Sequence, residues 1–165
     1  FNLDRAKFSG IELQFSYDAR RFFAEFGATY YDTVEFCRVG QPCLAEDLYR
    51  PVNRTWDYSA NHVPPEFMVT ATLGARFFDE ALTVGTRVTH ATARKIPPSP
   101  IDVSTAVVWA PFTVVDLFAS YKLNENLTFN ISAENLADKF YVDPLGGTPI
   151  AAPGRTIHVG FTAKF

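Results

Sequence analysis

Apolar and polar residues alternate along most of this chain with a period of two. Successive side chains of a β-strand point to opposite faces of a sheet, so this pattern predicts strands with one apolar and one polar face. In the first such segment, Ile11 and Leu13 lie in one phase and Glu12 and Gln14 in the other. The alternation predicts seven strands: residues 7–18, 22–34, 66–78, 81–91, 113–123, 127–136 and 155–165.

The lengths of the strands and of their connections point to a barrel that crosses a membrane. A tilted strand needs about 10 residues to cross a bilayer, and the predicted strands have this length or slightly more. Strands of soluble proteins usually have about five or six residues. Short turns at 18–21, 79–80 and 124–126 alternate with long connections at 35–64, 92–112 and 137–154. Outer-membrane barrels share this arrangement, with tight periplasmic turns and long extracellular loops.

The charged residues well inside the strands all fall in the polar phase. They are Glu12, Glu25, Arg76, Arg87, Asp116, Lys122 and Glu134. A lysine or arginine that faces lipid near the midplane costs roughly 2 to 4 kcal/mol, so the uncharged phase is expected to face lipid. Aromatic residues near the strand ends are expected to form two girdles at the membrane interfaces. Those near the long connections are Phe8, Tyr30, Phe67 and Phe112.

Composition excludes several other classes of protein. The chain has 165 residues, of which 47% are hydrophobic, 15% aromatic and 20% charged. Polar residues interrupt every apolar stretch, whereas a transmembrane helix needs roughly 20 apolar residues in a row. The aromatic content excludes a disordered chain, and a net charge of -3 offers no basic surface for nucleic acid. The start at Phe1 has no initiator Met and no apolar leader, so we expect no export signal within these residues and a longer parent protein.

The two cysteines, Cys37 and Cys43, lie close together in a polar stretch. A disulfide between them is expected to brace a loop and to contribute roughly 2 kcal/mol. Such a bond favours an oxidising compartment, such as the periplasm or the cell surface. Two free thiols are the alternative.

A soluble β-sandwich is the alternative fold, because its strands also alternate. It gives no reason for strands of this length or for the regular change between short turns and long loops. Seven strands would also leave two open edges, which lipid does not tolerate. The chain is therefore expected to form the end of a larger closed barrel.

Several segments resemble TonB-dependent outer-membrane receptors. The run Ile131-Ser132-Ala133-Glu134-Asn135-Leu136-Ala137-Asp138-Lys139-Phe140-Tyr141, with Pro153-Gly154-Arg155 and the strand up to Phe165, resembles their C-terminal end. The run Ser9-Gly10-Ile11-Glu12 is similar to a strand that often occurs in that family, and residues 65–78 resemble its strand after a Pro-marked loop.

The resemblance implies an all-β fold, a transmembrane antiparallel barrel of about 22 strands closed by an N-terminal plug domain. Residues 1–165 would be the C-terminal portion of the barrel domain and its last seven strands. It also implies TonB-dependent uptake of an iron-siderophore or haem ligand across the outer membrane of a Gram-negative bacterium. The implied partners are the chain's own plug and earlier strands, the TonB system, outer-membrane lipid and the ligand, with no cofactor. A plugless passive or structural barrel is the alternative.

The resemblance assigns a role to the polar phase, which would line the lumen and hold the plug by hydrogen bonds. The residues expected there are Glu12, Glu25, Arg76, Arg87, Asp116, Asn130, Glu134 and His158. Charged groups shielded from bulk water need partners, and a plug surface supplies them. The terminal Phe165 resembles the signal that the outer-membrane assembly machinery reads, and girdle packing is a compatible role for it.

Haem uptake would add an axial ligand, a His or Tyr on an extracellular loop. The candidates are His62, His90, Tyr49 and Tyr58, each of which is otherwise an ordinary polar loop residue. No Ser/His/Asp motif or paired acid and base suggests an enzyme, and no metal site is expected.

Overall fold

The computed structural model describes residues 5–37, 64–93, 110–143 and 150–165, and these form one antiparallel sheet. Its strands, in sequence order, are β1 (Arg5–Asp18), β2 (Phe22–Cys37), β3 (Phe67–Phe77), β4 (Leu82–Ala91), β5 (Phe112–Lys122), β6 (Leu127–Glu134) and β7 (Thr156–Ala163). Each strand pairs only with its neighbours in sequence. All seven predicted strands are confirmed, and every observed end lies within three residues of the predicted one. No helix among these residues is long and apolar enough to span a membrane.

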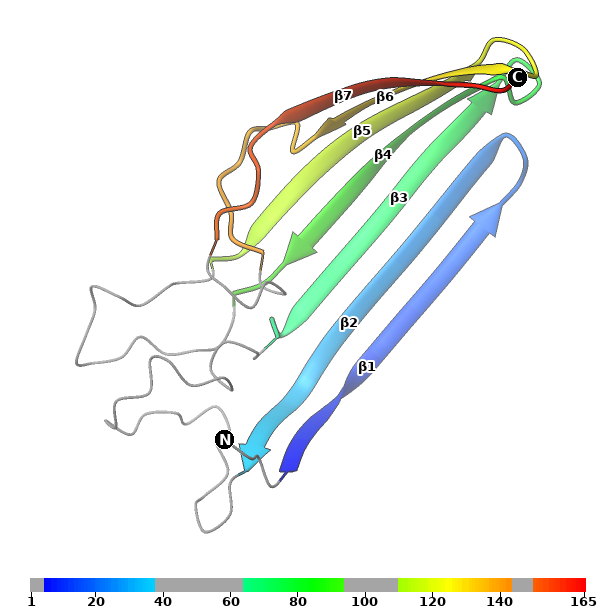
Figure 1. Ribbon diagram of the computed structural model, residues 1–165. Helices are drawn as coiled ribbons and strands as arrows, with labels where there is room; N and C mark the ends of the chain where they lie inside the picture. The colour runs from blue at the N-terminus through cyan, green and yellow to red at the C-terminus, as the bar shows by residue number, and fades with distance from the viewer. Residues whose placement is uncertain (1–4, 38–63, 94–109, 144–149) are drawn as a thin grey trace.

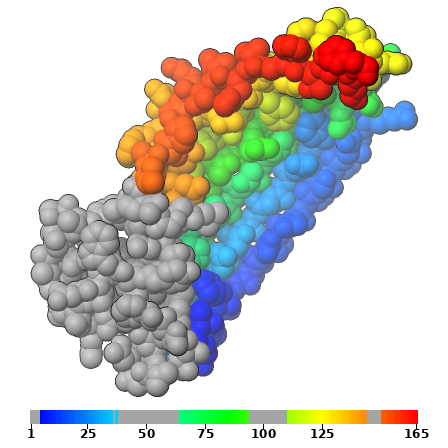
Figure 2. All heavy atoms as spheres, viewed as in Figure 1, coloured from blue at the N-terminus to red at the C-terminus, as the bar shows by residue number. Residues whose placement is uncertain are grey.

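The sheet is a single curved layer (Figure 1). The short turns between β1 and β2, β3 and β4, and β5 and β6 lie at one end of the sheet, and the strand ends that border the longer connections lie at the other. Figure 2 shows the strands packed side by side as a curved wall, with β1 and β7 at its two edges. This is the shape of part of a barrel wall.

The register keeps the two phases of the pattern on separate faces across the whole sheet. One row runs through all seven strands on the outer face: Tyr17, Ala24, Leu73, Thr86, Leu117, Ala133 and Ile157. This row begins near the turn at the end of β1 and finishes near the start of β7. Such a drift is expected for strands that tilt relative to a barrel axis. The outer phase is open to its surroundings, since Leu13 is 59% exposed.

Asp and Asn side chains shape two of the short turns. Asp18 accepts a hydrogen bond from the backbone N–H of Arg20 at 2.9 Å, which supports the positive φ of 62° at Arg20. In the turn between β5 and β6, Asn124 accepts one from the backbone N–H of Asn126 at 2.9 Å. Both are bonds from a side chain to the backbone two residues on, which is why Asp and Asn favour turns.

The motif that follows β6 forms a clasp, defined here as residues 135–143 and 150–155. Asn135 has a φ of 48° and is 4% exposed. Its amide donates to the carbonyls of Lys139 at 2.8 Å and Pro153 at 3.3 Å, and its oxygen accepts the N–H of Lys139 at 2.9 Å. Asp138 accepts the N–H of Arg155 at 2.8 Å. Two side chains therefore join the end of β6 to the start of β7.

A small apolar cluster fixes the clasp to the sheet. The Tyr141 ring stacks on Phe112 of β5 with 4.4 Å between centroids. Ala91 and Val114 lie under this pair, and Met68 packs against it. The clasp is thus tied to β4 and β5 as well as to β6 and β7.

Two members of the predicted girdle at the long-connection end were assigned to the wrong face. Phe112 lies in the inner phase of β5, is 5% exposed and is covered by Tyr141. Phe8 pairs with Val34 in the inner phase, above an irregularity in the β1–β2 register at Ser9 and Gly10. Tyr30 and Phe67 pair with each other in the outer phase, as a girdle requires.

The assignment of faces predicts opposite effects at adjacent positions of β1. In the complete receptor folded into lipid vesicles, Leu13→Lys is expected to lower the free energy of unfolding by about 2 to 4 kcal/mol, because it places a charge in hydrocarbon. Gln14→Lys is the matched control and is expected to cost less than about 1 kcal/mol, because that position faces the inside. Guanidinium unfolding measures both. Equal losses would contradict the assignment.

The clasp predicts that Asn135 matters through its side chain and its backbone. Asn135→Ala is expected to lower the free energy of unfolding by about 3 kcal/mol, because it leaves buried backbone groups unpaired and forces alanine into a left-handed conformation. Asn135→Gly loses the same side-chain bonds, but glycine adopts the left-handed conformation without strain. It is therefore expected to be about 1 kcal/mol more stable than Asn135→Ala. The same unfolding assay compares the two variants. Stability equal to that of the unchanged protein in both would show that the clasp is dispensable.

Candidate functional site

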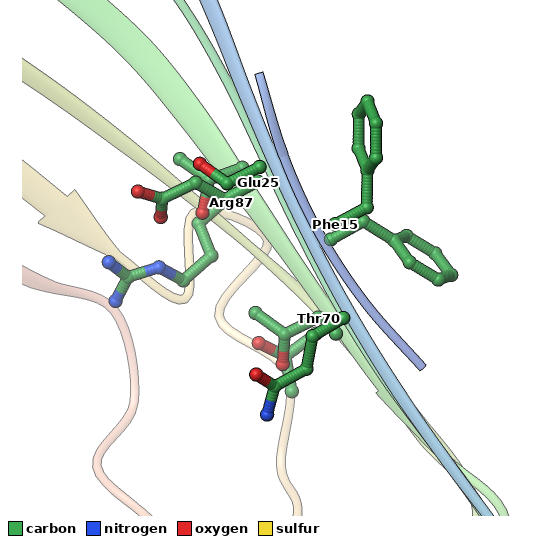
Figure 3. Close-up of a pocket in the computed structure, with 10 residues that line it drawn as sticks. Phe15, Glu25, Thr70 and Arg87 are labelled. Atoms are coloured by element: carbon green, nitrogen blue, oxygen red, sulfur yellow. The ribbon is translucent and has the colours of Figure 1, made fainter. Parts of the chain in front are cut away.

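The candidate site is the inner face of the sheet, toward which the later strands curl. Figure 3 shows Glu25, Arg87 and Thr70 on this side and Phe15 on the opposite side. The register places every charged residue expected in the lumen on this face: Glu12, Glu25, Arg76, Arg87, Asp116, Glu134 and His158. The sequence thus predicted their common face, and their contact with a plug stays a prediction.

Arg76 is held within the wall. Its guanidinium makes two hydrogen bonds of 2.8 Å to the carboxylate of Asp18 and a third of 2.8 Å to the carbonyl of Arg20. It also lies 4.7 Å from the centroid of the Phe23 ring. A bidentate pair of this kind is among the stronger ionic contacts in proteins. Arg76 therefore fixes the turn between β1 and β2, a role that sequence analysis did not assign.

Three further ionisable groups on the inner face also have partners in the wall. Asp116 accepts the backbone N–H of Asn135 at 2.8 Å, which connects β5 to the clasp. Glu134 lies 3.8 Å from His158 across the β6–β7 pair, and both side chains are well exposed. Asp116 thus has a structural contact, and the pair of Glu134 and His158 remains open to the lumen.

Glu25 and Arg87 differ from these groups, because neither makes an ion pair or side-chain hydrogen bond with another described residue. Both line a hollow of about 710 Å³ on the wall of β1–β4. Its other polar lining residues are Gln14, Ser16, Thr70, Thr72 and Thr89 (Figure 3). The hollow therefore offers hydroxyl groups, an amide and two opposite charges to whatever lies against it.

Aromatic rings lie over glycines of the wall beside this hollow. Phe23 covers Gly74, and Phe118 covers Gly85, so that a Cβ at either glycine would collide with a ring. Gly74 and Gly85 are themselves paired, so the four residues form one row across β2 to β5. The alternation alone did not predict this row. It shows two phenylalanines in a polar phase, but which glycines lie opposite them is known only from the strand register. Because the rings occupy the space above the glycines, the side chains of this row project little from the inner face.

The expected haem ligands are not brought together by the described residues. His62, Tyr49 and Tyr58 lie outside them. His90 pairs with Val69 in the outer phase, and its Nδ1 lies 2.8 Å from the Thr113 hydroxyl. Its ring is therefore turned away from the inner face. No cluster of three metal-ligating side chains occurs in the described ranges.

The surroundings of Tyr141 in the clasp shift the pKa of its hydroxyl. Burial raises the pKa of its hydroxyl above the usual value, and the carboxylates of Asp143, Asp116 and Glu134 raise it further. The phenol therefore stays protonated at neutral pH. The Tyr141 ring stacks on Phe112, so its observed role is to hold the clasp against the sheet.

The remaining candidates lie at the ends of strands. Cys37, the last residue of β2, is buried and disulfide-bonded. Its expected partner Cys43 lies outside the described residues, and the pairing stays a prediction. Phe165 lies two residues beyond the end of β7 and is fully exposed. Its role in assembly also stays a prediction.

Comparison with known proteins agrees with this geometry. The family model of TonB-dependent receptor-like β-barrels matches residues 1–136. The hemophilin receptor of Acinetobacter baumannii is 30% identical over 191 residues, which cover 99% of this chain and 18% of that protein. A probable TonB-dependent receptor of Haemophilus influenzae is 28% identical over 179 residues, which cover 90% of this chain and 19% of that protein.

Solved structures show the same fold. The FrpB iron transporter from Neisseria meningitidis has a TM-score of 0.68 and 22% identity, over 94% of this chain and 23% of its own. The siderophore receptor PiuA from Acinetobacter baumannii has a TM-score of 0.65 and 21% identity, over 97% of this chain and 22% of its own.

The chain spans about a fifth of the length of its curated relatives. Within that span, the resemblance to TonB-dependent receptors is confirmed, and so is the seven-stranded antiparallel wall. Because the barrel model covers most of the chain and the observed faces are those of such a wall, this chain belongs to the TonB-dependent receptor family, as a part of its β-barrel.

Proposed function

We propose that this chain forms the C-terminal part of the barrel of an outer-membrane receptor for TonB-dependent uptake of an iron-siderophore or haem complex. The observation that carries the proposal is the continuous apolar outer face set against a charged inner face. Only a wall between lipid and a polar interior needs this combination. The names of the relatives supply the cargo, since they include a hemophilin receptor and a siderophore receptor.

The same proposal gives the inner face a partner, the plug domain of the receptor. Glu25 and Arg87 support it most directly, because they line the hollow without an ionic partner in the wall. Charged groups removed from bulk water are stable only with partners of opposite charge or with several hydrogen bonds. Glu12, Glu134 and His158 extend this surface, whereas Arg76 and Asp116 contribute mainly to the rigidity of the wall.

Uptake is tested by growth of a strain that lacks the receptor. The complete gene is expected to restore growth on haem or on a ferric siderophore as the sole iron source, and only when the TonB system is intact, because the plug must be displaced by applied energy. Growth rates on each iron source, with and without TonB, give the answer. Restoration that does not need TonB would favour the plugless passive barrel instead.

The plug interface is tested by permeability of the resting receptor. Arg87→Ala is expected to raise the leak of large hydrophilic antibiotics about ten-fold, because the loss of a charge-assisted hydrogen bond of about 1.5 kcal/mol makes plug displacement more frequent. Arg87→Lys keeps the charge and is expected to leak less than Arg87→Ala. Thr83→Ala on the same face of β4, outside the hollow, is the matched control. No change in inhibitory concentration for Arg87→Ala would remove Arg87 from the interface.

A further inference from the structure

Two parallel rows of residues cross the floor of the hollow from β1 to β4 (Figure 3). In each row, every residue pairs in register with the next one. The first row is Gln14, Gly27, Thr70 and Thr89, and the second is Ser16, Glu25, Thr72 and Arg87. The first row is therefore neutral, and the second carries both charges of the hollow.

Gly27 stands at a position where the wall itself does not need a glycine. Its backbone has the ordinary extended conformation of β2, and a Cβ at this position would meet no atom within 4 Å. Gly74 and Gly85, by contrast, are covered by phenylalanine rings, and Gly160, which is also bare, lies outside the hollow. A glycine inside a strand lowers stability relative to alanine, because more backbone freedom is lost on folding. The glycine at position 27 therefore points to something that approaches the wall from inside the barrel.

Thr72, in the second row, has a buried hydroxyl without a partner in the wall. The residue is only 6% exposed and lies between Glu25 and Arg87 in the register. Its hydroxyl makes no hydrogen bond with any group of the described ranges. Buried polar groups of folded proteins nearly always have a hydrogen-bond partner, because an unpaired one is costly. This hydroxyl therefore also points to a group that is not part of the wall.

We propose that an extended stretch of the plug's main chain crosses the hollow above Gly27, with its peptide groups hydrogen-bonded to the hydroxyl of Thr72 and to the neutral row. This inference rests on the proposed function, which supplies the plug as the partner. The chain spans about a fifth of the length of its curated relatives, which leaves ample sequence for such a segment.

Main chain suits this place better than side chains do. Glycine in a strand commonly marks a point where another backbone approaches closely, since no Cβ keeps the two apart. A peptide group is both a donor and an acceptor, and the hydroxyls of Thr70 and Thr89 can bond either half of it. Glu25 and Arg87, on the two sides of Thr72, then remain for charged side chains of the same segment.

Hydrogen exchange of the full-length receptor in detergent tests the proposal, because it reports on backbone N–H groups. Mass spectrometry reads the exchange peptide by peptide. Thr72→Val keeps the shape of the side chain but removes the hydroxyl, and Gly27→Val fills the space above the glycine. Each is expected to speed exchange about ten-fold in one plug peptide that is protected in the unchanged receptor, because a hydrogen bond to its main chain is lost.

Two matched substitutions serve as controls. Thr83→Val removes a hydroxyl from the inner face of β4 outside the hollow, and Ala28→Val adds bulk next to Gly27 on the outer face. Both are expected to leave exchange of the plug unchanged. Exchange in peptides of β1–β4 shows whether each barrel has formed. Gly27→Ala, a smaller change, replaces Gly27→Val if that variant does not fold, and about three-fold faster exchange is expected for it.

The outcomes separate this inference from the function on which it rests. Unchanged exchange of every plug peptide in either Thr72→Val or the folded Gly27 variant would overturn the inference, and the hollow would then hold water or side chains. Equal acceleration in the controls would overturn it as well, because the plug would then respond to any change in the wall. Growth on single iron sources judges uptake separately: a receptor that shows the contact but supports no growth would refute uptake alone. A full-length receptor without a plug would refute both.

Discussion

A β-barrel wall that faces lipid depends on one constraint, which is that lipid offers no hydrogen-bond partners to a polypeptide backbone. The seven strands satisfy it by pairing with their sequence neighbours from β1 to β7. Because the register decides which face each side chain takes, the same pairing that satisfies the backbone also separates the apolar phase from the charged one. A closed wall then requires strands beyond both edges of this sheet. The faces, the turns and the inner surface all follow from this ladder.

The charged groups of the inner face fall into two sets, and the structure separates them. Arg76 and Asp116 bind other parts of the wall: Arg76 holds the first turn through Asp18, and Asp116 holds the clasp through Asn135. Glu25 and Arg87 have no such contacts within the described residues and line the hollow. A wall with its structural charges already paired keeps its shape whether or not a partner lies against it, which suits a surface proposed to meet a movable plug.

Much of this arrangement could be predicted from the sequence, because a period of two determines faces wherever strands are long and regular. Leu13 and Arg87 were placed on the correct faces without coordinates. The two girdle errors came from judging Phe8 and Phe112 by their nearness to a strand end. By alternation, Phe8 shares the inner phase of Glu12 and Phe112 that of Asp116, and it is this phase that decides the face. Contacts between distant residues were also out of reach. The pairing of Arg76 with Asp18, separated by 58 positions, depends on the register of three strands.

The motif around Asn135 was recognised by resemblance, but the function of this asparagine could be seen only in the structure. Its side chain donates hydrogen bonds to the carbonyls of Lys139 and Pro153, on the two sides of the clasp.

The chemistry of the hollow is consistent with a contact that must open and close. Separating two apolar surfaces costs about 25 cal/mol for each Å² exposed to water, and nothing offsets that cost. Hydroxyl and amide groups regain hydrogen bonds from water when a partner leaves, so their net contribution is only about 1 kcal/mol each. The hollow is lined by such groups, among them Thr70, Thr72 and Gln14.

The two large rings next to it, Phe23 and Phe118, lie against glycines, where part of their apolar surface is already covered by the wall. Opposite charges at Glu25 and Arg87 then supply orientation without strong adhesion, since a misplaced partner would leave both unpaired. The proposed plug would therefore be held in one position on this surface and still be released at modest cost.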